Sequence, residues 1–177
     1  MPALFALATS VGLLAVLDTW LYVGPLAATI LTGLVWQSFI AWGCHFHSGG
    51  GTKGATTTVV CNSWGALVGM VAVMLASGPF SSLGVMAAPI AVGIGAAAIC
   101  LSSKLSVLAT IPASVYGFAL IAGPILLRGD APQNAILPTI GSIFIGAIFG
   151  YVSEMLANAL TKKADPTAEA TADPGHA

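Results

Sequence analysis

Apolar residues follow one another in six long runs, separated by short stretches rich in glycine, proline, serine and charged residues. A helix that crosses a membrane needs about 20 mostly apolar residues, because about 30 Å of hydrocarbon is covered at about 1.5 Å per residue. The pattern therefore predicts an all-α polytopic membrane protein. Its six transmembrane helices are expected at residues 3–22, 26–42, 55–77, 83–101, 105–127 and 136–160.

The composition excludes soluble classes of protein. Only 6% of the 177 residues are Asp, Glu, Lys or Arg, whereas 57% are hydrophobic. In a typical soluble domain, about a quarter of all residues are charged. Five basic residues cannot neutralise a row of phosphates, so nucleic acid is not an expected partner. No catalytic motif has the spacing of a nucleophile elbow or a zincin, and we expect no enzymatic activity and no cofactor.

The basic residues predict the orientation of the chain. An even number of crossings places both termini on one side, and residues 164–177 are expected to form a disordered tail there, since they offer little to bury. Lys53, Lys104 and the Lys162-Lys163 pair fall on that side, and only Arg128 falls on the other. Cytoplasmic loops carry an excess of Lys and Arg, so both termini are predicted to be cytoplasmic.

The sequence matches itself when it is shifted by 81 residues. Ile40-Ala41 then meets Ile121-Ala122, and WGALVGMVAVMLA meets IGAIFGYVSEMLA. We interpret residues 3–78 and 84–160 as two repeats of three crossings each. Because three is an odd number, the second repeat enters from the opposite side, which gives the inverted-topology arrangement common in channels and transporters. This association is one of architecture, not of chemistry.

The third and sixth predicted helices each carry two glycines four residues apart. These are Gly65 with Gly69 and Gly146 with Gly150. Membrane helices attract one another mainly by close backbone approach, which glycine allows, so the favoured interpretation is helix packing. The alternative is that these glycines line a narrow pore.

Three polar side chains are expected in one layer of the cytoplasmic half. Gln37, Asn62 and Glu154 each lie about 9–12 Å from the nearer helix end at about 1.5 Å per residue. A polar group in a membrane is costly and commonly faces the bundle interior or a wet cavity. The layer is therefore a hydrogen-bond network or a solute or proton site, unless Glu154 extends to the lipid headgroups. Asp18, near the outer end of the first helix, is expected at the interface.

The segment 43–54 is predicted to be a glycine-rich loop that leads into the third helix. Free N–H groups at a helix start, with Lys53, favour an anion or a dipole. Cys44, His45 and His47 are potential metal ligands, but a single cluster is a weak signal and we assign no metal site. The remaining alternative is a flexible hinge or cap.

Several of these motifs together resemble a known family. GGGTKG, Asn62 with Gly65, and the Ser153-Glu154 pair resemble DUF1097, a family of small bacterial inner-membrane proteins of unknown function, although Cys44-His45-Phe46-His47 before the glycines departs from the pattern. The resemblance implies a bacterial inner membrane and about six crossings. It implies no activity.

Three functions remain open at this point. The favoured one is a channel or facilitator for a small polar solute that is neutral, such as urea or a short amide, or for a small anion. The second is a proton- or ion-coupled transporter that uses Glu154, and the third is a non-transporting scaffold. Partners are expected to be membrane lipid, the solute and further copies of the chain, since six short helices enclose little volume.

Overall fold

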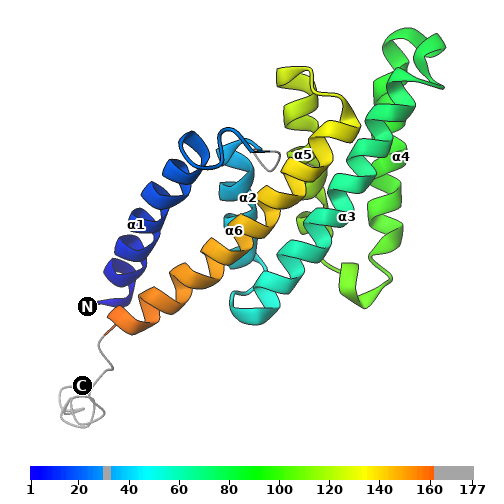
Figure 1. Cartoon of the computed structure of the whole chain (residues 1–177). Helices are drawn as coiled ribbons and strands as arrows, with labels where there is room; N and C mark the ends of the chain where they lie inside the picture. Colours follow the sequence, from blue (N-terminus) through cyan, green and yellow to red (C-terminus); the bar gives the residue numbers. More distant parts are fainter. Residues whose placement is uncertain (30–32, 162–177) are drawn as a thin grey trace, which may run out of the picture.

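The computed structural model describes residues 1–29 and 33–161, and this part of the chain is helical throughout its regular structure (Figure 1). The predicted tail at 164–177 lies outside the described residues. Five helical stretches are long and apolar enough to cross a membrane, so the predicted all-α polytopic fold is confirmed. The elements are α1 (Ala3–Val23), α2 (Val35–His47), α3 (Gly51–Ser77), η1 (Ser81–Met86), α4 (Ala87–Ser102), η2 (Ser106–Leu108), α5 (Ile111–Arg128) and α6 (Pro132–Leu160).

The second helix is shorter than predicted. It was expected over 26–42, but residues 24–28 form turns after α1, Gly33 and Leu34 are non-helical, and α2 has only 13 residues. At about 1.5 Å per residue this helix is about 20 Å long, too short to cross the hydrocarbon alone. Gly24 and Pro25 break the apolar run, and hydropathy alone does not detect where the helix resumes.

The termini show that the chain nevertheless crosses the membrane between α1 and α3. The amino group of Met1 donates to the carbonyl of Leu160 at 3.1 Å, so the start of α1 and the end of α6 lie side by side (Figure 1). With five long spans alone the two ends would face opposite sides. The segment 24–50 must therefore supply another crossing, made partly of non-helical backbone. Such backbone is tolerated at membrane depth only where protein buries it or where it lines a wet cavity.

Four other helices begin at different residues than predicted, among them α4 at Ala87 instead of 83 and α6 at Pro132 instead of 136. Helix α3 begins at Gly51 instead of 55, so most of the predicted loop 43–54 is helical. Helix α5 begins at Ile111 instead of 105, after the short turn η2. Pro112 stands in the first turn of α5, the position where a missing N–H costs nothing, and this favours a helix start at that point.

The helices pack as two similar halves. The long helices α3 and α6 pack against each other, α1 and α2 pack on α6, and α4 and α5 pack on α3. Each buried residue of α3 has a buried counterpart 81 positions later in α6. Buried Ala6, Ser10 and Asp18 of α1 likewise correspond to buried Ala87, Ala91 and Ile99 of α4. This packing is what a two-fold repeat requires, and the repeat itself stays a prediction.

The correspondence differs in the second helix pair. Buried Ser38 of α2 corresponds to buried Ser114 of α5, which is 76 positions later instead of 81. The offset is already 76 where the two helices begin, and it returns to 81 at α3 and α6 because α5 has 18 residues and α2 has 13. The matches of Ile40-Ala41 with Ile121-Ala122 at 81 are therefore not structurally equivalent.

The four glycines of the paired motifs lie at helix contacts. A Cβ on Gly65 would meet the carbonyl of Ser114 in α5, and one on Gly146 would meet the carbonyl of Ser38 in α2. Gly69 and Gly150 face the same two helices, α5 and α2. The motifs therefore join α3 to α5 and α6 to α2, in the manner of small-residue packing in membranes.

Candidate functional site

The turn between α2 and α3 is built from consecutive glycines. Gly49, Gly50 and Gly51 have φ angles of 97°, 67° and 57°, a region that residues with a Cβ rarely adopt. A Cβ on Gly50 would in addition lie 2.9 Å from the carboxylate oxygens of Glu154. The turn thus needs glycine for its conformation, and at Gly50 the missing Cβ leaves room for the Glu154 carboxylate in its present position.

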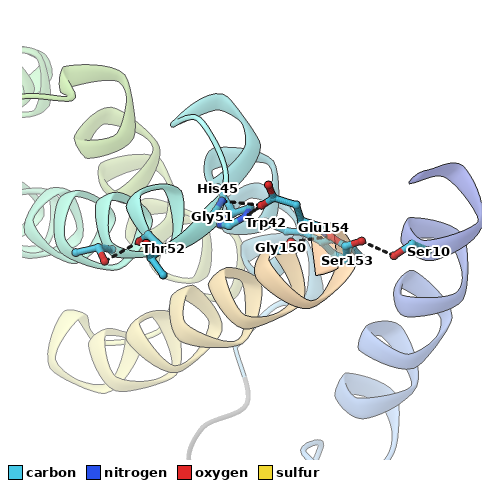
Figure 2. A network of polar contacts seen from close by, with 9 residues as sticks. Ser10, Trp42, His45, Gly51, Thr52, Gly150, Ser153 and Glu154 are labelled. Carbon is cyan, nitrogen blue, oxygen red and sulfur yellow. Dashed lines mark hydrogen bonds and ion pairs between the residues drawn. The ribbon is translucent and has the colours of Figure 1, made fainter. Parts of the chain in front are cut away.

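Glu154 closes this turn from α6. Its Oε2 accepts a hydrogen bond from the N–H of Gly51 at 2.6 Å and lies 3.1 Å from Nε2 of His45 (Figure 2). The first turn of a helix favours negative charge, so the carboxylate stabilises the start of α3. The predicted anion site at the glycine-rich turn is thus filled by a side chain of the same protein. The Glu154 side chain is 35% exposed, and His45 beneath it is fully buried.

Ser153, the residue before Glu154 in α6, connects three helices. Its hydroxyl accepts from Nε1 of Trp42 at 2.9 Å and donates to the carbonyl of Gly150 at 2.8 Å. The hydroxyl of Ser10 donates to the Ser153 carbonyl at 2.6 Å (Figure 2). These bonds join α1, α2 and α6 with few exposed polar atoms.

Gln37 holds the interrupted crossing in place. Its Oε1 accepts from the N–H of Leu34 at 2.7 Å, and its Nε2 donates to the carbonyl of Leu120 at 2.7 Å and to Thr139 Oγ1 at 2.9 Å. The side chain is fully buried. Gln37 therefore satisfies non-helical backbone at α2 and joins it to α5 and α6.

The predicted polar layer is divided among separate contacts. Asn62 Oδ1 accepts from Cys44 Sγ at 3.5 Å, and its Nδ2 has no partner among the described residues. Gln37, Asn62 and Glu154 form no hydrogen bond with one another in that part of the chain, so a hydrogen-bond network that joins the three side chains directly is not observed. The equal depths along three helices were no guide to which face each side chain occupies.

The remaining loop residues point to different partners. His45 contacts Glu154, while the ring of His47 lies edge-on to Tyr116 with centroids 5.9 Å apart. Lys53 is exposed on the first turn of α3, and no ion pair involves it within the described ranges. The described part of the chain holds no group of three or more His, Cys, Asp or Glu side chains arranged for a metal.

A polar cluster that the sequence did not reveal lies where α1, α2 and α6 meet. Asp18, Ser38 and Ser142 are fully buried and Tyr22 is 6% exposed, so the expectation of an interfacial Asp18 is wrong. The Ser38 hydroxyl is a near neighbour of both Asp18 and Tyr22, and Ser142 is a near neighbour of Tyr22. Even so, none of these side-chain oxygens has a partner in hydrogen-bond geometry among the described residues. The spacing of Ala6, Ser10, Asp18 and Tyr22, at multiples of four, could have indicated a buried face on α1.

A family model connects these features to known sequences. The model described as "Protein of unknown function (DUF1097)" matches residues 8–158. The chain belongs to the DUF1097 family. No curated protein and no solved structure matches it. The matched range of this DUF1097 protein includes the glycine turn, Glu154 and the Asp18 cluster.

Proposed function

We propose that this DUF1097 protein moves a small polar solute across the membrane as a gated facilitator or carrier. The observation that carries the proposal is the interrupted second crossing, whose non-helical residues and short helix pack against α6 beside buried polar side chains. Transporters commonly place their solute sites at interrupted helices between inverted repeats. Because the polar side chains are fully buried, a solute reaches them only when the helices move apart.

The side chains favour a neutral solute of the urea or short-amide class. Hydroxyl and amide groups bind such solutes by hydrogen bonds, and the buried carboxylate of Asp18 repels an anion. A cavity of about 480 Å³ between α3 and α6 has a different character, because Val59, Phe144 and Ile148 line it. It suits lipid chains, in keeping with the apolar surfaces of these helices.

The proposal also covers the repeat, the membrane, the orientation and the oligomeric state of the protein. The supports are the similar packing of the two halves, the adjacent termini and the long apolar helices. From these we infer an inverted-topology repeat in a bacterial inner membrane, with both termini in the cytoplasm, and a homo-oligomer. No enzymatic activity is part of the proposal.

Flux through purified protein tests the proposal. In proteoliposomes, stopped-flow light scattering should show faster entry of urea or formamide than protein-free vesicles allow, with glycerol and chloride as comparison solutes. Glu154→Gln keeps the shape of the side chain and removes its charge. Because Glu154 closes a turn away from the buried cluster, this variant should retain flux.

Two outcomes support the other functions. Uptake that follows a pH gradient and is lost in Glu154→Gln would favour a proton-coupled transporter, which is a specific alternative because Glu154 contacts His45. Folded protein that moves none of these solutes would contradict transport and favour a scaffold.

The orientation has its own test. Lys53 and Lys104 lie at the ends of α3 and α4 that share the side of Met1, and Arg128 pairs with Asp130 at the opposite side. A cysteine placed next to Arg128, in a variant without native cysteines, should react with an impermeant maleimide in intact cells. A cysteine next to Lys104 should react only after lysis. The reverse pattern would show that the termini face outward.

A further inference from the structure

The Asp18 cluster gathers several buried oxygen atoms that have no hydrogen-bond partner in the part of the chain that the structure describes. Both Asp18 carboxylate oxygens and the hydroxyls of Tyr22, Ser38 and Ser142 lack a hydrogen-bond partner among the described residues, and all four side chains are at least nine-tenths buried. A polar group buried without a partner costs about 1–3 kcal/mol, and an unpaired charge costs more. Several such groups in one place point to a ligand that would satisfy them together.

We propose that this cluster binds one dehydrated monovalent metal cation, of which Na⁺ is the first to be tested. Hard cations take carboxylate, hydroxyl and carbonyl oxygens as ligands, which are the atoms gathered here. One carboxylate balances one positive charge. A divalent ion would leave an uncompensated charge at a fully buried position, which is strongly unfavourable.

The backbone beside the cluster fits the same ligand. Gly33 lies in the non-helical stretch before α2, and a Cβ on it would meet Ser142 Oγ and Gln37 Oε1. Non-helical backbone therefore approaches the cluster at a place where a side chain would block it. In transporters with interrupted helices, unwound backbone carbonyls commonly complete cation sites.

Comparison with the other half shows that the cluster is not a general requirement of packing. The residue that corresponds to Asp18 is buried Ile99, and Cys61 corresponds to Ser142. Ser114 corresponds to Ser38 and is equally buried, with a hydroxyl that also lacks a partner. The same helix contacts thus form in the second half without a carboxylate. We therefore infer that the charge of Asp18 serves to bind the cation and not to hold the helices together.

The inference deepens the proposed function, since it makes the cation a coupling ion for solute movement, but binding can be measured without transport. Thermal unfolding of the full-length protein in detergent should be followed with increasing NaCl, with choline chloride keeping the ionic strength constant, at pH 6 and pH 8. A ligand that binds only the folded state raises Tm continuously, in proportion to the logarithm of its concentration once this exceeds Kd. We expect this rise with Na⁺ at both pH values and not with choline.

Three variants identify the site. Asp18→Asn removes the charge and should weaken apparent Na⁺ affinity by at least about tenfold, as expected for loss of a charged ligand. Ser38→Ala should weaken it by severalfold. The matched control Ser114→Ala removes an equally buried hydroxyl from the other half and should leave Na⁺ affinity unchanged. If Asp18→Asn does not fold, Ser142→Ala against Ser114→Ala gives the same comparison, supported by ²²Na⁺ binding to the wild type.

Four results would overturn the cation site. The first is a wild-type Tm that does not change with Na⁺, and the second is a rise in Tm that choline reproduces. The third is a Tm that responds to pH alone, which would indicate that the cluster binds a proton instead. The fourth is a loss of Na⁺ affinity in Ser114→Ala equal to that in Ser38→Ala. Na⁺ binding without solute flux would keep the site and contradict the transport proposal. Urea flux, together with a Tm and a flux that do not depend on Na⁺, would support the transport proposal and contradict the cation site.

Discussion

Alanine at position 117 or 65 is expected to prevent stable assembly of the helices. A Cβ on Gly117 would meet the backbone of Asn62, and a Cβ on Gly65 would meet the carbonyl of Ser114. Backbone atoms cannot rotate away as a flexible side chain can, so α3 and α5 would have to separate along their contact. Overpacking of this kind costs about 1–3 kcal/mol even where side chains can adjust. That is a large part of a total stability of about 5–15 kcal/mol.

The measurement is the yield of monodisperse protein in mild detergent together with Tm. Both Gly117→Ala and Gly65→Ala should lower the yield severalfold and reduce Tm. The matched controls are Gly12→Ala in α1 and Gly93→Ala in α4, where a Cβ would have no neighbour within 4 Å. Alanine favours a helix by up to about 1 kcal/mol over glycine, so the controls should be neutral or slightly stabilised. Equal effects at all four positions would contradict the assigned contacts.

Hydropathy was sufficient to predict the long helices but not the interrupted one. Five crossings follow from apolar length, because each of these helical stretches has at least 18 residues and comes close to or exceeds what the hydrocarbon requires. Residues 26–34 are as apolar as the predicted transmembrane helices. They nevertheless follow Gly24-Pro25 and precede a helix that begins only at Val35. The interruption is stabilised by Gln37 through Leu120 and Thr139, contacts between residues distant in sequence.

In the candidate site too, the local sequence indicated individual residues but not the contacts between residues that are distant in sequence. The glycine turn and Glu154 were both recognisable as unusual, but their contact joins residues 103 positions apart and no local pattern reveals it. Counting from the helix end gave Asp18 a depth near the interface. Its burial depends instead on the face of α1 that packs on α6.

Leucine at position 37 is expected to destabilise the interrupted crossing in particular. Gln37→Leu has similar volume but removes one acceptor and two donated hydrogen bonds inside the bundle. The N–H of Leu34 and the carbonyl of Leu120 would lose these bonds, and an unsatisfied buried group costs about 1–3 kcal/mol. We expect a lower Tm and faster amide hydrogen exchange at the start of α2, because Leu34 is non-helical and has no bond along a preceding helix turn to replace the lost one.

Thr139→Val is the matched control for this prediction. Valine has nearly the shape of threonine and removes only the acceptor of one Gln37 bond, while the bonds from Leu34 and to Leu120 can persist. The control should therefore lower Tm less and leave amide exchange at α2 close to that of the wild type. If both variants increase exchange at α2 equally, Gln37 stabilises the bundle through Thr139 and not through the non-helical backbone. Exchange unchanged in Gln37→Leu would show that the interruption does not depend on this side chain, and the packing of Gly33 against Ser142 would then be its main support.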